Sequence, residues 1–182
     1  MKRQLWAAIV ALGLAAALLA VAHPAAAAPR PDGASARASF HGAVIDLASG
    51  WQGAQSCVVY SRTDVRCYAG YGEADTALGY SRAADPLVAV TPRAVPSCAS
   101  GWLCLYENVD GAGRRLQFRD EYWNYLSTYG FDRATSSWRN NQGSTDSGAL
   151  SLYNRSTVYT CGANSYALQL GVYDNQAYAV WG

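Results

Sequence analysis

Leu103-Cys104-Leu105-Tyr106 recurs 47 residues later as Leu150-Ser151-Leu152-Tyr153, and this repeat decides the fold class. Each copy leads to a turn with an acidic residue, Gly130-Phe131-Asp132 in the first copy and Gly171-Val172-Tyr173-Asp174 in the second. Two copies of roughly four strands each can bury a shared core that one copy could not form alone. The repeat therefore predicts a mainly β domain with two packed antiparallel sheets and Greek-key connections.

The chain around the repeat has the pattern of an all-β domain, because short apolar runs are separated by Gly, Asn, Asp and Ser. Leu116 and Phe118 alternate with Arg115, Gln117 and Arg119, which is the period of a strand with one buried and one polar face. We expect strands over residues 103–107, 114–119, 136–140, 149–154, 166–170 and 178–181.

The segment before the repeat has the pattern of a small α+β module. A strand is expected over 40–47, a hairpin over 56–61 and 64–68, and a helix over 73–84 that Asp85-Pro86 ends. Pro86, Pro92 and Pro96 then favour an extended connector. The expected organisation is a signal peptide (1–27), a flexible lead-in (28–37), the α+β module (38–85), a proline-rich linker (86–96) and the β domain (97–182).

The first 27 residues have the features of a signal peptide. Met1-Lys2-Arg3 is basic, an apolar run spans 5–21, and Ala25-Ala26-Ala27 supplies the small residues needed before the cleavage point. A membrane-spanning helix over 5–22 is the alternative, but the cleavage triplet and the polar chain that follows favour export. We expect a secreted protein without membrane contact once the signal is removed.

Removal of that segment leaves 12 arginines, no lysine and 13 acidic residues, a net charge of −1. Since the longest arginine run is Arg114-Arg115, the sequence shows no cluster of basic residues of the kind that binds the phosphates of a nucleic acid. His41 is the one remaining histidine, at the start of a predicted strand where a structural role is expected. Because Ser and Cys nucleophiles and catalytic zinc usually depend on histidine or lysine, we expect no enzyme. Paired carboxylates are the other route to catalysis, but the adjacent Asp120 and Glu121 would point to opposite faces of a strand.

All five cysteines lie in the exported part, where thiols are expected to oxidise. A hairpin centred on Arg62 would set Cys57 opposite Cys67 within disulfide reach, and Cys98 and Cys104 would close a short loop. Cys161 is left over. It is either buried as a small apolar group or exposed and able to pair between chains, so the oligomeric state stays open.

Two motifs resemble known families. Tyr106-Glu107 followed by Gly113-Arg114, and then the turn Asp132–Ser137 entering a strand, resembles the βγ-crystallin motif. The placement of Cys98 and Cys104 around the first strand resembles that in the secreted actinobacterial branch of these proteins. This branch comprises the metalloproteinase inhibitors of peptidase inhibitor family thirty-six. The resemblance covers about 97–182 and implies a non-enzymatic inhibitor whose partner is an extracellular peptidase of the metallo or serine type.

The resemblance also implies where the inhibitory loop lies. In the family this loop belongs to the second motif, between two close cysteines, whereas this chain has only Cys161 there, followed by Gly162 and Ala163. These three residues are the candidates by position. Two more candidate loops, 99–103 and 60–64, are braced by the expected disulfides. A disulfide orders the loop before binding, so less conformational entropy is lost when the loop binds.

The resemblance also implies calcium binding. The weak candidate ligands are Asp132 and Ser136 in the first copy and Asp174 and Asn175 in the second, since calcium prefers hard oxygens. In the six-residue calcium signature of the family, which is the turn Asp132–Ser137 here, Arg133 takes the second acidic position. We therefore expect no required cofactor. The other reading is that these side chains bond to turn backbone groups.

An alternative function is a calcium- or glycan-binding structural module of the cell envelope. Exposed aromatic side chains can stack on sugar faces, and the candidates for such stacking are Trp51, Trp102 and Trp123. The competing expectation for each tryptophan is burial in the core.

Overall fold

The computed structural model describes residues 35–91, 95–154 and 156–182. The predicted signal peptide and most of the lead-in lie outside these residues, so secretion stays a prediction. Within the described chain the lead-in ends earlier than expected. Ala36 is buried and donates its backbone N–H to the Thr128 carbonyl, and Arg37 begins the first strand.

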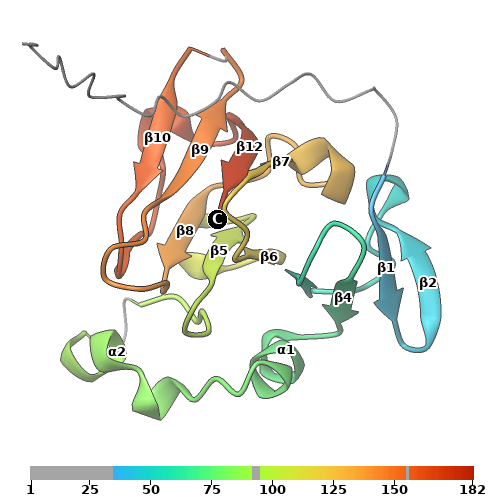
Figure 1. Cartoon of the computed structure of the whole chain (residues 1–182), viewed down its shortest axis with the longest axis horizontal. Helices are drawn as coiled ribbons and strands as arrows, with labels where there is room; N and C mark the ends of the chain where they lie inside the picture. Colours follow the sequence, from blue (N-terminus) through green and yellow to red (C-terminus); the bar gives the residue numbers. More distant parts are fainter. Residues whose placement is uncertain (1–34, 92–94, 155) are drawn as a thin grey trace, which may run out of the picture.

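Twelve strands form two sheets in the described residues (Figure 1). One sheet has eight strands in the order β11-β8-β5-β6-β3-β4-β1-β2, and the other has four in the order β10-β9-β12-β7. The strands are β1 (Arg37–Phe40), β2 (Ala43–Asp46), β3 (Ser56–Val59), β4 (Val65–Tyr68), β5 (Leu103–Tyr106), β6 (Arg115–Phe118), β7 (Trp123–Tyr125), β8 (Ser137–Asn140), β9 (Gly148–Leu152), β10 (Val158–Cys161), β11 (Ser165–Ala167) and β12 (Ala177–Trp181).

The two copies of the repeat exchange one strand each. β5, β6 and β8 of the first copy share the eight-stranded sheet with β11 of the second, while β9, β10 and β12 share the other sheet with β7 of the first. Each sheet therefore needs both copies, which is why neither copy could close a core by itself. The prediction of a mainly β, two-sheet Greek-key fold is confirmed by the strand order.

The main core lies between the sheets. Leu105, Leu116 and Trp138 from the larger sheet meet Leu150 and Val180 from the smaller one. These residues follow the two-residue period of their strands, so the expected apolar faces are the buried ones. Gly113 has φ +75°, the left-handed conformation that glycine adopts without a Cβ penalty.

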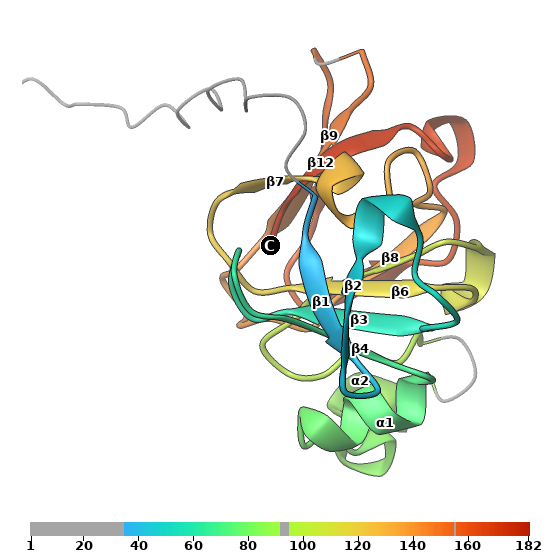
Figure 2. The ribbon, with the colours of Figure 1, turned by 90° about the vertical axis from the view of Figure 1, so that its right-hand side faces the viewer.

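The module before the repeat continues the larger sheet. β3 pairs with β6 in parallel, with Cys57 opposite Leu116, and β4, β1 and β2 extend the sheet further. Figure 2 shows β3 and β6 side by side and the β1–β2 hairpin at the front of the molecule. The predicted division at residue 97 stays a prediction, but the sheet itself runs across it.

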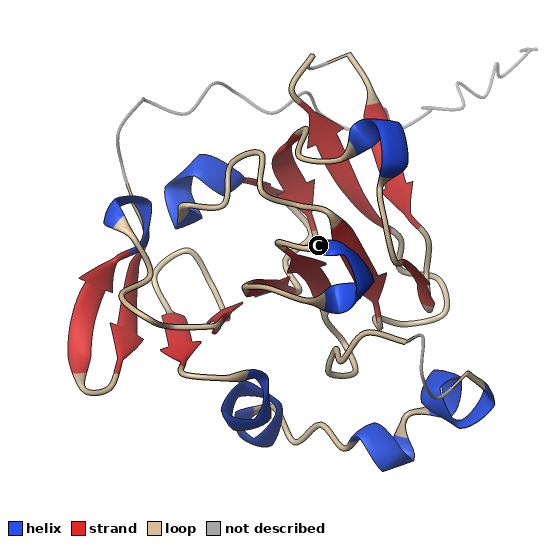
Figure 3. Cartoon of the chain, turned by 180° about the vertical axis from the view of Figure 1, so that it is seen from behind, coloured by secondary structure: helices blue, strands red, loops and turns tan. Residues whose placement is uncertain are grey.

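The far face of the larger sheet is covered as well. Its side chains, among them Tyr106, Arg115 and Arg139, are almost fully buried. They lie under a helical segment that contains α1 (Tyr71–Ala77), a 3-10 turn (Arg82–Ala84) and α2 (Pro86–Val90), seen along one side of the strands in Figures 1 and 3. The polar face expected on solvent for 114–119 is therefore wrong for Arg115 and Gln117, because the module covers it.

Three local expectations in the module are also wrong. The strand over 40–47 is a hairpin, since His41 and Gly42 have positive φ and turn the chain between β1 and β2. The helix over 73–84 ends at residue 77, before Gly79 in the left-handed region. The connector starts as a helix, because the Asp85 carboxylate accepts the Leu87 N–H and Pro86 stands at the first position.

Short helices complete the fold. Four further 3-10 turns are Leu47–Ser49, Val109–Gly111, Leu126–Tyr129 and Gly171–Tyr173. None of the helices in the described ranges is long and apolar enough to cross a membrane.

Candidate functional site

The loops that the sequence singled out lie at one end of the larger sheet. The start of β11, the end of β8, the start of β5 and the end of β6 are neighbours, because Ser165 pairs with Asn140, Asn140 with Leu103 and Leu103 with Phe118. β3 runs parallel to β6, so the loop after β3 is at this end too. We call residues 60–64, 99–102, 141–142 and 162–164 the loop end.

A disulfide closes the loop before β5. The Cys98–Cys104 bond has an S–S distance of 2.00 Å. The backbone of Asn141 donates to the Trp102 carbonyl and accepts from Gly101, and its side-chain amide donates to the Cys98 carbonyl at 2.8 Å. Ser100 and Gly101 are the exposed tip of this loop. Its backbone is therefore held on both sides, and little freedom is left to lose on binding.

Cys161 is the buried end of the second candidate loop. Its side chain is fully buried and its thiol is free, which fits the first of the two expectations. Loss of hydration raises the pKa of this thiol well above its usual value. The Cys161 carbonyl accepts a hydrogen bond from the Asn140 side-chain amide at 2.9 Å. Cys161 thus offers neither its thiol nor its carbonyl to a partner.

The residues after Cys161 form a tight turn. The Ser165 hydroxyl donates to the Gly162 carbonyl at 2.6 Å, and Asn164 has φ +49°. Gly162 and Ala163 are half-buried and Asn164 is exposed. Of the predicted loop, the surface therefore presents 162–164 in a turned rather than an extended shape.

The third candidate loop closes the β3–β4 hairpin. Cys57 and Cys67 are opposite each other in the ladder and joined by a disulfide with an S–S distance of 2.04 Å. The Ser61 hydroxyl accepts the backbone N–H groups of Thr63 and Asp64. Arg62 is exposed at the tip, with its guanidinium carbon 4.0 Å from the centre of the Tyr122 ring.

The calcium candidates lie at the opposite end of the sheet, where β5 ends and β8 begins. Ser136, Asp174 and Asn175 line one open pocket there together with Glu107 and Asn108. Asp132 is not among the lining residues, so the structure brings three of the four candidates together. The Asp174 carboxylate accepts from the Asn175 side-chain amide at 3.1 Å, a bond between two side chains rather than the expected bond to turn backbone.

The charges around this pocket are already partly paired. Glu107 bonds with Arg114 through both carboxylate oxygens, the shorter contact being 2.8 Å, and these bonds lower the pKa of Glu107. Arg133 lines the pocket, and its guanidinium carbon lies 4.5 Å from the centre of the Tyr153 ring. Within the described part of the chain no group of three or more His, Cys, Asp or Glu residues could hold a metal ion.

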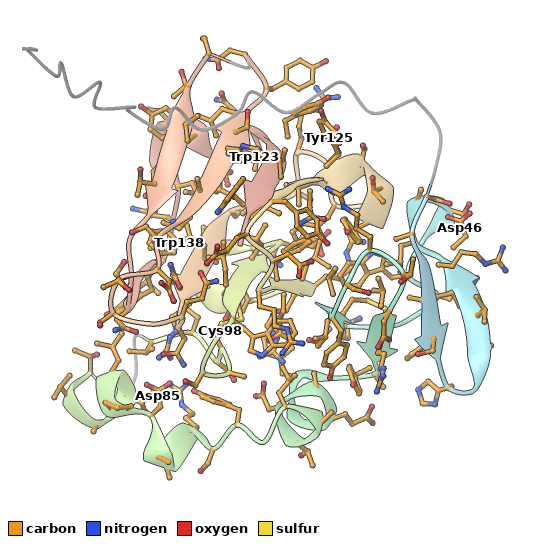
Figure 4. The ribbon with its side chains drawn as sticks, viewed as in Figure 1. Asp46, Asp85, Cys98, Trp123, Tyr125 and Trp138 are labelled. Carbon is orange, nitrogen blue, oxygen red and sulfur yellow. A yellow bond between two sulfur atoms is a disulfide. The ribbon has the colours of Figure 1, made fainter. Side chains whose placement is uncertain are left out.

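Two of the three tryptophans proposed for sugar stacking are buried. Trp51 and Trp102 are each 4% exposed, and the Trp51 ring nitrogen donates to the Tyr129 carbonyl. Trp123 is half-buried and lies edge-on to Trp181, with ring centres 5.9 Å apart. Figure 4 places Trp123 and Tyr125 on the smaller sheet, far from Cys98. Trp51 and Trp102 are therefore wrong as sugar contacts.

His41 lies at an exposed turn instead of in a strand. It shares a shallow pocket with Ser39 and Glu73, and its ring packs edge-on against Phe40 with the centres 4.3 Å apart. Among the described residues no hydrogen bond joins His41 to Ser39 or Glu73.

The amide run Asn140-Asn141-Gln142 ties the Cys98–Cys104 loop and the Cys161 loop together and was not predicted from the sequence. Three consecutive amide side chains at the end of a strand are a readable signal, since such groups bond to neighbouring backbone. Their partners could not be predicted, because they come from 98–102 and 161 and depend on the order of strands in the sheet.

Known proteins resemble this chain in two ways, while no curated protein matches it. The solved structures that match part of it include a βγ-crystallin domain from work on the evolution of the eye lens fold, at 15% identity over 48% of this chain and 89% of that one, with a TM-score of 0.41. The N-terminal domain of protein S matches at 18% identity over 44% and 92%, with a TM-score of 0.36. Spherulin 3A from Physarum polycephalum matches at 14% identity over 48% and 86%, with a TM-score of 0.38.

The family comparison concerns the second half of the chain. Residues 91–178 match the model of Peptidase inhibitor family I36, and this range contains the Cys98–Cys104 loop, the amide run and the Cys161 turn. Members of such a family act by binding a peptidase, so the match agrees with the prediction of a protein that is not an enzyme. The match covers residues 91–178, so this part of the chain is similar to Peptidase inhibitor family I36.

Proposed function

We propose that this protein is secreted and inhibits an extracellular peptidase of the metallo or serine type, and that it binds the peptidase through the loop end. The observation that carries the proposal is the convergence of all three candidate loops at one end of one sheet, within a chain whose residues 91–178 match a family of peptidase inhibitors. Loops that are far apart in the sequence thereby form one surface.

The contact is expected at the exposed tips rather than at Cys161. Ser100, Gly101 and Asn164 are exposed, and both loops are anchored by hydrogen bonds to the amide run. An anchored loop binds without a large loss of conformational entropy. The peptidase would therefore meet a rigid surface made of two turns, and the bond after Cys161 would stay covered.

Titration of thermolysin and of subtilisin with the protein from residue 28 onward tests this function. We expect the residual activity of one of them to fall linearly to an equivalence point near one inhibitor per enzyme, with the inhibitor intact by mass spectrometry. No loss of activity at a large excess, or rapid digestion of the protein by both enzymes, would contradict the proposal.

A pair of alanine substitutions locates the contact. Ala163 lies in the turn at the loop end, and Ala112 is exposed in the loop between β5 and β6 at the opposite end of the sheet. Ala163→Trp should raise the inhibition constant roughly tenfold or more, because the added ring separates the two surfaces. Ala112→Trp is the control and should leave the constant unchanged. Equal effects of the two changes would argue against the loop end.

Calcium binding at the opposite end is the second candidate. The gathering of Ser136, Asp174 and Asn175 around one pocket favours it, since these side chains offer oxygen ligands. Calcium should then raise the melting temperature, and Asp174→Asn should abolish the rise whereas Asp146→Asn, at an exposed position away from the pocket, should keep it. A melting temperature that is indifferent to millimolar calcium would rule this candidate out.

A further inference from the structure

A pocket lies at the seam between the module and the β domain. One wall is the segment 78–86, between α1 and α2, and the other wall consists of Ser100, Asn141, Gln142 and Asn164. We call it the seam pocket. Because Ser100, Asn141, Gln142 and Asn164 all belong to the loop end, the pocket opens within the surface that is proposed to meet the peptidase.

The module wall is clamped to the sheet beneath it. Asp85 and Arg139 form an ion pair at 2.7 Å, and each side chain is 1% exposed. Asp85 also accepts from the Tyr80 hydroxyl at 2.8 Å, and Arg139 donates to the Pro96 carbonyl at 2.9 Å. Figure 4 shows Asp85 and Cys98 on the same side of the strands. The wall is thus a fixed part of the site.

The lining of the seam pocket suits a particular kind of side chain. Leu78, Pro86 and the Tyr80 ring supply apolar surface, and the lining contains no arginine or lysine. The Gln142 side-chain oxygen is buried and has no hydrogen-bond partner within the described structure. An acceptor without a donor costs free energy, and an N–H that enters the pocket would recover it once the Gln142 amide turns toward the pocket. A long side chain that ends in N–H donors, as in lysine, arginine or glutamine, satisfies both requirements.

We propose that the seam pocket receives a donor-tipped side chain of the bound peptidase, so that the segment 78–86 helps to decide which peptidases are inhibited. This inference rests on the proposed inhibitory function. The segment 78–86 precedes the family-matched range 91–178, so the module adds to the site a wall from outside that range. The module then has a recognition role besides covering the sheet.

A filled pocket tests the proposal in the full mature chain, with inhibition constants measured against thermolysin and subtilisin. Ala84 lines the pocket, and its neighbour Ala83 does not, while both are exposed in the same 3-10 turn. Ala84→Trp should raise the inhibition constant roughly tenfold or more, and Ala83→Trp should leave it unchanged. Ser81→Trp, from the same wall, replaces Ala84→Trp if that variant melts at a lower temperature.

Gln142→Met separates recognition from stability. It keeps the length of the side chain and removes the acceptor, so inhibition should weaken about fivefold to tenfold while the melting temperature stays or rises. If the wild type inhibits and both Ala84→Trp and Gln142→Met inhibit equally well, the seam pocket proposal is overturned and the inhibitory function stands. If the wild type inhibits neither peptidase, the proposed function falls and the pocket proposal falls with it.

Discussion

Gly130 shows how a single residue joins the module to the sandwich. It ends the 3-10 turn Leu126–Tyr129 with φ +60°, and a Cβ at this position would overlap the backbone carbonyl of Leu47 in the module. Two separate requirements therefore act on one residue: a left-handed conformation and close contact between two backbones. The contact is with backbone, which cannot swing away as a side chain could.

Gly130→Ala should destabilise the protein more than Gly79→Ala. Gly79 has a similar φ of +66° but open space where the Cβ would stand, so its replacement should cost about 1 to 2 kcal/mol from backbone strain alone. The Gly130 variant adds a displacement of the Leu47 backbone. Urea unfolding of both variants measures the difference, and equal losses would show that the close contact is not important.

Asp85 is the residue on which the clamp of the helical segment depends. Burial by itself would raise the pKa of Asp85, but the hydrogen bonds from Arg139 and Tyr80 outweigh it and lower the pKa. A carboxyl whose pKa is lowered by folding stabilises the protein above its unfolded pKa, and this contribution is lost as the pH falls through the folded pKa. Asp85 therefore contributes fully at neutral pH and progressively less below about pH 4.

Asp85→Asn should lower the free energy of unfolding at pH 7 by about 3 to 5 kcal/mol, because Arg139 stays buried without a counter-charge. Below about pH 4 the stability of the variant should also fall less steeply than that of the wild type. Asp64→Asn, which breaks an exposed pair with Arg66, is the control and should have little effect. Urea unfolding at neutral and acidic pH tests this; an Asp85 variant as stable as the control would mean that the clamp does not hold the segment.

At the scale of elements, the two disulfides brace different loops. Cys57–Cys67 joins neighbouring strands of a hairpin, and Cys98–Cys104 closes the loop whose tip is Ser100 and Gly101. Both close short loops, with sequence separations of 10 and 6, so their entropic contributions should be similar. Only the second lies beside the seam pocket.

Replacing either cysteine pair by alanine should cost about 2 to 3 kcal/mol of stability. Loss of Cys98–Cys104 should also weaken inhibition strongly, since Ser100 and Gly101 beside the seam pocket would lose their bracing, whereas loss of Cys57–Cys67 should weaken it less. Thermal unfolding and inhibition constants of the two double variants separate the effects. Should both variants inhibit as the wild type does, bracing of the loop before β5 has no part in recognition.

The elements also show what the sequence could predict. Strands with a clear two-residue period, such as β5 and β6, were predicted within one or two residues, because the period follows from a single buried core. β7 and β10 were missed, since Trp123–Tyr125 is three residues long with Asn124 as its buried residue, and Val158–Cys161 is mostly exposed. Asp85-Pro86 was interpreted as a helix end although a capping aspartate before proline also begins helices.

The candidate site was less predictable than the strands. The disulfide pairs followed from local geometry, a hairpin for Cys57–Cys67 and a short loop for Cys98–Cys104, because each joins residues close in sequence. The convergence of 60–64, 99–102 and 162–164 depends on strand order, which no local pattern encodes. The burial of Arg115 was unpredictable for the same reason, because most of its partners, Ser56, Tyr71 and Asp75, come from the module, and one more is Ser97.

At the scale of the whole molecule, the module and the β domain share one structure. Arg115 and Arg139 project from the larger sheet into the module, where Asp75 and Asp85 pair with them. Tyr106 and Trp102 are buried in a second apolar cluster with Val58 and Ala74 of the module. Without the module, two charged side chains would lose their partners and this cluster would lose part of its cover.

A chain that starts at residue 97 should therefore fail to fold stably, although the family-matched range lies almost entirely within it. We expect poor dispersion in its proton–nitrogen correlation spectrum and no cooperative thermal transition, while the chain from residue 28 shows both. A well-dispersed spectrum for the short chain would mean that the β domain is independent and that the shared sheet is dispensable.

Hydrogen exchange of the mature protein, alone and saturated with the peptidase that it inhibits, tests the central claim most directly. Binding should slow exchange in 60–64, 78–86, 99–102 and 162–164 together, and leave the calcium-candidate turn at 174–175 unchanged. Slowed exchange at that turn or in the β1–β2 hairpin, with none at the loop end, would contradict the claim that these converging loops carry the recognition.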